Sequence, residues 1–127
     1  MTYSFENLLV WQKAHRFVLE TYRITRKFPE EEKYCLISQF RRAAISIEAN
    51  IAEGYKKISK ADKLRFYNIA QGSLEECRNY HILSRDLGYI ENEEFCLLHQ
   101  SLEETSKFLN AYCKAIVNNQ AMKEDWI

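Results

Sequence analysis

The stretch QFRRAAISIEANIAEG, residues 39–54, combines an apolar helical stripe with a row of polar side chains. In an α-helix, residues three and four positions apart lie on one face. The apolar positions of this region follow that spacing: Leu36, Phe40, Ala43, Ala44, Ile47, Ile51 and Gly54. The stretch therefore predicts a long helix with one face buried in a core.

A second row, made of polar residues, runs along the shoulder of the same helix. Its members are again three or four positions apart: Gln39, Arg42, Ser46, Asn50 and Glu53. Ile45, Ala49 and Ala52 fall on the side that faces away from the core, where a monomeric bundle normally presents charge. Small or apolar side chains there would let another subunit approach closely, and the polar row would fix its register. Alternatively, the alanines are good helix formers on an exposed face and the polar row forms pairs within the helix.

Three further segments show helical periodicity, and turn signals are sparse, since the chain holds three Gly and one Pro. We predict helices over residues 8–27, 30–56, 60–87 and 92–118, followed by a tail at 119–127. Phe28-Pro29 is suited to end the first helix, Ser59 and Asn92 to cap the third and fourth, and Gly88 to end the third. The short connections favour a single all-α domain, residues 1–127, folded as an up-down-up-down antiparallel four-helix bundle.

The third helix is expected to contribute both core and polar contacts. Its predicted inward face is Phe66, Ile69, Ala70, Ser73, Cys77, Tyr80, Ser84 and Leu87. Gly72, inside the helix, is interpreted as a position of close packing, because a helical glycine costs about 1 kcal/mol against alanine. If the second and third helices are neighbours, Ser73 and Glu76 can bond to the row that holds Arg42 and Asn50. This would form a buried polar network.

Basic residues gather at two places in a chain whose 18 Lys and Arg balance 18 Asp and Glu. Residues 1–65 hold 13 basic and 8 acidic side chains, and residues 66–127 hold 5 and 10. One basic group lies at the second connection: Lys56, Lys57, Lys60, Lys63 and Arg65. The other lies at the end of the first helix: Arg23, Arg26 and Lys27. Repeated around a ring, such groups could contact the phosphates of RNA or DNA, although a solvated loop explains the same lysines equally well.

Catalytic signatures do not stand out in the sequence. His15, His81 and His99 are far apart and form no Glu-x-x-His ligand pattern, so each is expected at a surface or an interface, with no metal and no cofactor. The four cysteines form no C-x-x-C pair and are interpreted as buried free thiols of a cytoplasmic protein. The amino-terminal residues lack a secretion signal, and no apolar run is long enough for a membrane span. An alternative is an orphan enzyme or ligand-binding bundle that uses Arg42, Asn50, Glu53 and Glu76.

The segments FENLLVWQKAH, FPEEEKYCLISQFRRAAISIEANIAEG and RFYNIAQGSLEE, in this order, resemble the four-helix-bundle family encoded in intervening sequences of bacterial 23S ribosomal RNA. The resemblance covers about residues 4–118. The family pattern is carried by Ser38, Gln39, Arg41, Arg42, Ala43, Ser46, Ile47, Asn50, Ile51, Ala52, Glu53, Gly54, Ala70, Gly72, Ser73 and Glu76. After AEG this chain has YKKISK, where relatives commonly carry an Arg, so the bidentate geometry of a guanidinium is lost.

The resemblance implies a homopentameric ring of bundles. It also implies kinship with the accessory variability determinant of diversity-generating retroelements, which partners a reverse transcriptase and binds nucleic acid. The predicted function is therefore that of a non-enzymatic oligomeric scaffold. Its expected partners are further copies of itself and RNA, DNA or a reverse transcriptase.

Overall fold

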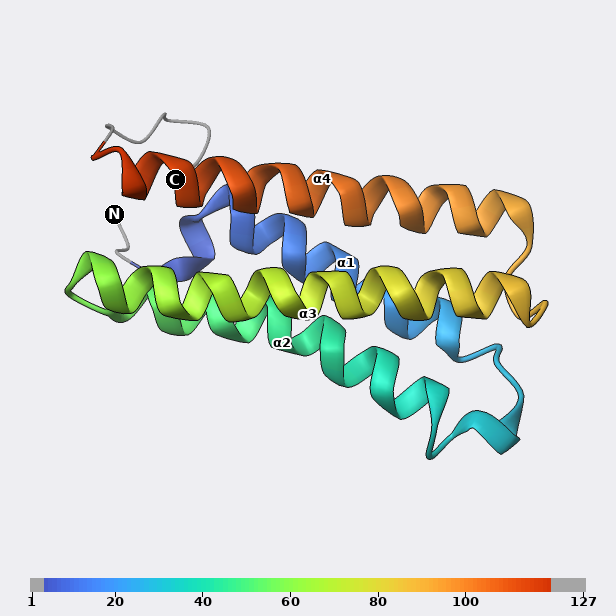
Figure 1. Cartoon of the computed structure of the whole chain (residues 1–127). Coiled ribbons are helices and arrows are strands. Elements are labelled where there is room, and N and C mark those ends of the chain that lie inside the picture. Colours follow the sequence, from blue (N-terminus) through green and yellow to red (C-terminus); the bar gives the residue numbers. More distant parts are fainter. Residues whose placement is uncertain (1–3, 120–127) are drawn as a thin grey trace.

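The computed structural model describes residues 4–119, and this part of the chain is helical without strands (Figure 1). The four long helices are α1 (Leu9–Thr25), α2 (Leu36–Lys56), α3 (Lys60–Asp86) and α4 (Asn92–Val117). Two short 3₁₀ helices, η1 (Phe5–Asn7) and η2 (Glu30–Glu32), precede α1 and α2. Within the described residues, no helix is long and apolar enough to cross a membrane. The chain is therefore an all-α, four-helix structure, as predicted.

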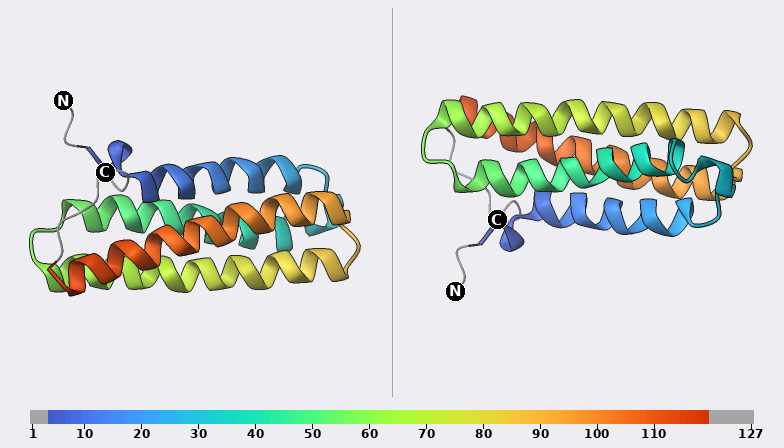
Figure 2. Two further views of the ribbon diagram at one scale, coloured as in Figure 1. Left: turned by 90° about the horizontal axis from the view of Figure 1, so that it is seen from above. Right: turned by 90° about the horizontal axis from the view of Figure 1, so that it is seen from below.

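Helices that follow one another in the chain lie side by side, and α4 also packs against α1. The most extensive contact joins α2 and α3. Figures 1 and 2 show that the chain turns back at each connection, so that the α2–α3 connection and the end of α4 lie at one end of the bundle. The connection that contains η2 and the α3–α4 connection lie at the opposite end.

The start of α2 and the cap of α4 differ from the sequence prediction, whereas α4 begins at residue 92 as predicted. Helix α2 begins at Leu36 and not at residue 30, because residues after Pro29 form i→i+3 bonds, such as Glu32 N–H to Pro29 O at 2.9 Å, and Cys35 breaks the helical geometry (φ −126°, ψ −100°). Asn92 is the first residue of α4 and not its cap, since Glu91 takes the cap position without a side-chain bond.

The other predicted boundary signals agree with the structure. Ser59 caps α3 as predicted, and its Oγ accepts from the Asp62 N–H at 3.1 Å. Gly88 follows the end of α3 with a left-handed φ of 80°. The predicted tail at 119–127 lies outside the described residues except for Asn119.

The core contains large side chains from all four helices, including Phe17, Phe40, Tyr67 and Leu102. The apolar stripes of α1, α2 and α4 are largely buried. The face predicted for α3 is confirmed at Ala70, Ser73, Cys77 and Ser84, but other positions are wrong. Ile69 and Leu87 are exposed and Phe66 is half-buried, whereas Tyr67, Leu74 and His81 are buried. The hydropathy pattern misplaces this face because a tyrosine and a histidine, which are amphipathic, occupy its central positions.

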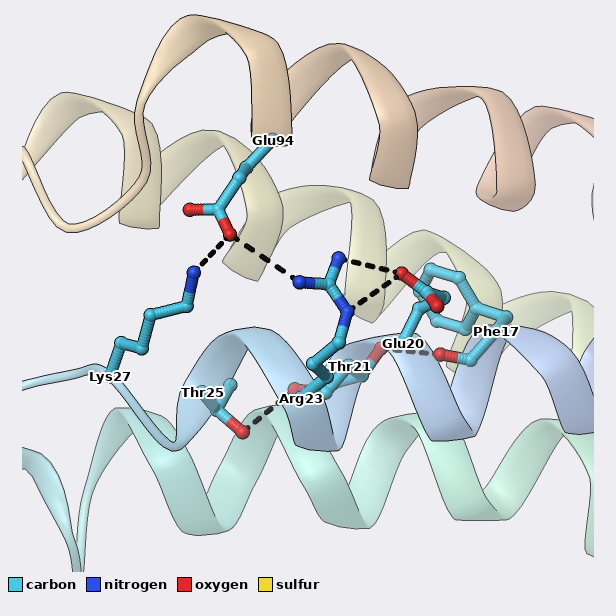
Figure 3. A network of polar contacts seen from close by, with 7 residues as sticks. All are labelled: Phe17, Glu20, Thr21, Arg23, Thr25, Lys27 and Glu94. Carbon is cyan, nitrogen blue, oxygen red and sulfur yellow. Dashed lines mark hydrogen bonds and ion pairs between the residues drawn. The ribbon is translucent and has the colours of Figure 1, made fainter.

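Four buried hydroxyl groups in the core donate to carbonyl groups of their own helices. Thr21 donates to Phe17 O at 2.8 Å and Thr25 to Thr21 O at 2.7 Å, as Figure 3 shows. Ser84 and Thr105 make the same bond to the carbonyl four residues earlier. These contacts reduce the desolvation cost of burying a hydroxyl group.

Gly54 is buried where α2 meets the ring of Tyr67 on α3. A methyl group added at Gly54 would lie 2.6 Å from Tyr67 Cε1. By contrast, nothing lies within 4 Å of a methyl group added at Gly72, which is exposed. The expected close packing of Gly72 is therefore wrong within one chain, and Gly54 is the glycine that the fold requires for close approach.

We predict that Gly54→Ala lowers the free energy of unfolding by about 1–2 kcal/mol, because overpacking at the Tyr67 ring outweighs the gain in helix propensity. Gly72→Ala is the matched control and should raise it by up to about 1 kcal/mol. Urea unfolding at one protein concentration measures both. Equal stability of the two variants would contradict the required contact.

His81 is buried in the seam between α3 and α4, contrary to the expectation of a surface or interfacial histidine. Its ring stacks on Phe95, with centroids 4.0 Å apart, and its Nε2 has no hydrogen-bond partner among the described residues. Burial, together with the nearby His99 and Arg85, lowers the pKa of His81 to about 4. The folded state therefore holds this ring neutral at pH values where the unfolded chain would protonate it.

We predict that the protein loses about 2 kcal/mol of stability between pH 7 and pH 5 through His81. The sign follows because the unfolded state takes up a proton below its pKa near 6.5, whereas the folded state does so only near 4. Stability therefore rises with pH across this window. Urea unfolding of wild type and His81→Phe at both pH values measures the effect. An identical loss in the variant would show that other groups cause it.

Candidate interaction surfaces

One open face of the bundle combines exposed side chains of α2 and α3. We call it the α2–α3 face and define it by Gln39, Arg42, Ile45, Ala49, Glu53, Ile69, Gly72, Glu76 and Leu83, all exposed. The face surrounds a contact between the two helices, at Ser46 and Ser73. Arg42 and Ala49 lie one turn to either side of Ser46, and Ile69 and Glu76 one turn to either side of Ser73. The face thus brings most of the predicted polar row together with apolar and small residues.

Part of the predicted polar network forms inside the chain. Ser46 Oγ and Ser73 Oγ lie 2.7 Å apart, and Asn50 Nδ2 donates to Ser46 Oγ at 3.0 Å and to Ser46 O at 2.8 Å. Ser73 is buried, and the other two residues are half-buried. These three residues therefore join α2 to α3, and their hydrogen-bonding groups are engaged within one subunit.

The charged members of the row remain open to solvent. Glu76 accepts a long hydrogen bond of 3.4 Å from Tyr80 Oη. Burial raises the pKa of Tyr80, and the Glu76 carboxylate raises it further. The positive charge of Arg42 lowers this pKa, because Arg42 lies near the pair. The side chains of Gln39, Arg42 and Glu53 have no hydrogen bond or ion pair with another residue of 4–119. Their polar groups are available to a partner.

The side of α2 next to α1 is covered by the chain itself, which the sequence reasoning missed. Phe5 of η1 meets Trp11 edge to face at 5.1 Å, and Trp11 stacks on His15 at 4.7 Å. His15 Nδ1 lies 2.7 Å from Glu48 Oε2 on α2. Ala52 is half-buried and lines, with Phe5, a groove between η1 and α2. Intrachain packing therefore explains the small residue at 52 without another subunit.

The two adjacent arginines of α2 have different roles. Arg41 donates from Nε to Thr25 Oγ1 at 2.9 Å and stacks over the Tyr22 ring, 4.4 Å from its centroid. It therefore fastens α2 to the end of α1. Arg42, one position later, points to the open face. Helix spacing accounts for the different roles of the two arginines, because Arg41 lies on the side of α2 next to α1 and Arg42 on the far side.

The basic group at the α2–α3 connection is only partly free. Lys63 donates to Tyr55 O at 2.7 Å and to Gly54 O at 3.4 Å, so it closes the end of α2, and burial lowers its pKa. Lys60 donates to Asn119 Oδ1 at 2.8 Å. Lys57 and Arg65 both lie over the ring of Phe66, 4.9 and 5.1 Å from its centroid. Lys56 and Lys57 are the members whose ammonium groups have no ion pair or hydrogen bond among residues 4–119.

The basic group at the end of α1 is largely neutralised by acidic neighbours. Arg23 pairs with Glu20 at 2.8 Å and with Glu94 at 3.6 Å, and Lys27 also pairs with Glu94 (Figure 3). The hydrogen bond and charge of Glu20 are the main reasons that the pKa of Arg23 is raised. Arg26 is exposed. This group lies at the end of the bundle opposite to the α2–α3 connection, so the two basic groups do not form one surface (Figure 1).

Reactive side chains show no convergent arrangement in the described part of the chain. No three His, Cys, Asp or Glu residues there could hold a metal ion. All four cysteines are free, and Cys35 and Cys96 are exposed, which corrects the expectation that the thiols are buried. Among Arg42, Asn50, Glu53 and Glu76, no hydrogen bond or ion pair joins any two within residues 4–119, and Asn50 is held by Ser46. The enzyme alternative therefore has no assembled group to support it.

These observations define an all-α four-helix protein with an open, mixed polar and apolar face. Residues 6–111 match the family model described as 23S rRNA-intervening sequence protein, and the chain belongs to this family. A crystal structure of a protein with unknown function from the S23 ribosomal protein family of Bacteroides thetaiotaomicron VPI-5482 is similar, with a TM-score of 0.77 and 25% sequence identity. The similarity covers 83% of this chain and 98% of that chain. No curated protein matches the sequence.

Proposed function

We propose that the protein is a non-enzymatic scaffold that assembles with further copies of itself through the α2–α3 face. The assembling unit is an up-down-up-down antiparallel bundle, and the resemblance to pentameric relatives favours a ring of five. The observation that carries the proposal is the composition of this face. Three large apolar side chains, Ile45, Ile69 and Leu83, are 40–47% exposed there. Beside them lie Arg42 and Glu53, whose side chains have no ion pair within residues 4–119.

The α2–α3 face combines apolar, small and charged side chains, and each kind has a role in a contact between copies. Apolar side chains that lie together on a surface favour association, and small residues such as Ala49 and Gly72 allow close approach of a second backbone. Arg42 and Glu76 carry opposite charges and can pair across a contact between copies, which would fix its register. Ser46, Asn50 and Ser73 are engaged inside the chain, so they support the face from beneath.

We predict that Ile45→Asp reduces the mass of the particle in solution to that of one chain, 15.2 kDa, because a charge would be buried at the contact. Wild type should have a mass about five times larger. Size-exclusion chromatography with multi-angle light scattering measures both masses. Circular dichroism should show unchanged helix content, because Ile45 lies outside the core.

Leu97→Asp is the matched control for this experiment. Leu97 is 52% exposed on α4, outside the α2–α3 face, so the change adds the same charge at a similar exposure. It should leave the mass unchanged. A wild-type mass of one chain would refute the assembly, and equal effects of both variants would refute the choice of face.

We also propose that the α2–α3 connection contacts nucleic acid, either free or held by a partner such as a reverse transcriptase. The observation that favours this role is the arrangement of Lys57 and Arg65 over the ring of the half-buried Phe66, beside Lys56, whose side chain has no partner in the described part of the chain. Cations held over an aromatic ring can contact a phosphate while the ring stacks on a base. In a ring, the connection would be repeated at one end of every bundle.

We predict that Lys56→Glu with Lys57→Glu weakens RNA binding at least about tenfold at low salt and reduces its salt dependence, because fewer phosphate contacts release counterions. The control is Lys107→Glu with Lys114→Glu, which makes the same charge change at exposed positions of α4. Fluorescence anisotropy with a labelled single-stranded RNA at several salt concentrations measures both. Equal weakening by the two pairs would indicate a general charge effect and contradict this site.

A further inference from the structure

A groove lies at one end of the bundle, between the α2–α3 connection and the last turns of α4. Its volume of about 400 Å³ is in the range of ligand pockets. The lining includes Ile58 from the connection, Lys60 and Lys63 from the start of α3, and Tyr112 and Ile116 from α4. No residue of the α2–α3 face lines it, so the groove is separate from the contact proposed between copies.

The groove carries positive charge that no acidic side chain compensates. Among the described residues that line it, none is acidic. Lys60 Nζ donates to Asn119 Oδ1 at 2.8 Å, and Lys63 Nζ donates to Tyr55 O at 2.7 Å, so both ammonium groups are held by neutral oxygens. Asp62, also in the first turn of α3, lies outside the lining and pairs with an arginine three positions later. The groove therefore favours an anion.

A second groove of similar volume, between α1 and α4, does not have this charge. It is lined by Lys13 and Arg16 but also by Glu20 and Glu104. Lys13 forms an ion pair with Glu104. An anion that entered this second groove would meet two carboxylates and would have to displace an existing pair. The uncompensated charge is thus a property of the groove at the α2–α3 connection and not of every groove between these helices.

Beside its ammonium groups the groove presents an apolar surface. Ile58 is 98% exposed, and the partly buried Ile116 lines the same groove. A ligand that fits both features has a flat apolar body next to an anionic group. A nucleotide has this composition, since its base has two apolar faces and its phosphate carries the charge. An acidic side chain of a peptide carries the charge but lacks the flat body.

The groove also continues the surface that we propose for nucleic acid. Lys57 directly precedes Ile58 in the α2–α3 connection, and Lys57 Nζ lies 4.9 Å from the centroid of the Phe66 ring. The cations over Phe66 and the groove are therefore joined by two adjacent residues of the chain. A strand whose phosphates lie along the connection passes the opening of the groove.

We propose that the groove holds one unstacked nucleotide of a single-stranded RNA that is bound at the α2–α3 connection. The base lies against Ile58 and Ile116, and the neighbouring phosphate pairs with Lys60. This assignment rests on the nucleic-acid contact proposed above, and it adds a preference for single strands. In a duplex the bases are stacked and paired, so none of them can enter the groove.

Ile58→Ser tests the contact with the base without a change of charge, and Ile58 lies outside the core, so the fold is kept. In fluorescence anisotropy at constant salt, this variant should bind a labelled unstructured single-stranded RNA about threefold or more weakly, because apolar contact with the base is lost. Its affinities for an RNA duplex of equal length and for inorganic polyphosphate, measured by competition, should not change. Leu19→Ser, at a 57% exposed apolar position on α1, is the matched control and should leave all three affinities as in wild type.

Methyl NMR of the full chain gives a second readout that depends on an aromatic ligand. Single-stranded RNA should move the δ1-methyl resonances of Ile58 and Ile116 upfield, because a base that lies against a methyl group shields it with its ring current. Polyphosphate and polyglutamate have no aromatic ring and should not cause this shift. The methyl group of Ile24, which is buried in the core, is the internal reference and should stay in place with all three ligands.

The possible failures of the groove and of the nucleic-acid contact can be told apart. If wild type binds no single-stranded RNA, both are wrong. If Lys56→Glu with Lys57→Glu weakens RNA binding but Ile58→Ser does not, the contact at the connection stands and the nucleotide in the groove is overturned. Equal weakening of single-strand and duplex binding by Ile58→Ser, or the same upfield shift with polyglutamate, would also overturn the nucleotide as the occupant.

Discussion

The close approach of α2 to α3 at Gly54 is the contact on which the rest of the structure depends. The ring of Tyr67 occupies the space that a side chain at residue 54 would need. This contact sets the distance between the two helices, so Ser46 and Ser73 can share a hydrogen bond about two turns earlier along α2. It also places the carbonyl groups of Gly54 and Tyr55 within reach of Lys63, which closes α2. A glycine, two serines and a lysine thus form one continuous seam.

The surroundings of α2 explain why its sequence combines several patterns of apolar, polar and small residues. One side faces the core, a second joins α3 through Ser46, and a third meets α1 and the amino-terminal segment through Arg41 and Glu48. Within residues 4–119, only the side that carries Arg42, Ile45 and Ala49 is left open. An ordinary surface helix presents mostly charge on its open side, whereas this one presents apolar and small residues between charges. Assembly with further copies is the simplest physical reason for that composition.

The sequence was sufficient to predict four helices, most of their ends and the buried stripes of α1, α2 and α4. These features depend on local spacing and on residues such as Ser59 and Gly88, whose effects act within a few positions. The sequence was insufficient to predict features that depend on contacts between residues far apart in the chain. Tyr67 and His81 occupy core positions that hydropathy assigns to Ile69 and Leu87, and Gly72 does not share the close contact of Gly54. The positive charges of Arg23 and Lys27 are compensated by Glu94, which lies 67 residues from Lys27 in the chain.

The two ends of the bundle differ in whether acidic side chains neutralise their basic side chains. At the end that holds η2, Glu94 and Glu20 neutralise Arg23 and Lys27, so a phosphate would have to displace existing ion pairs there. At the other end, Lys63 and Lys60 are held by neutral oxygens, which leave the positive charge uncompensated. The net neutrality of the chain therefore conceals a local field. In the proposed symmetric ring, this field would add up on one rim and not on the other, and the assembly of neutral subunits would have a single basic edge.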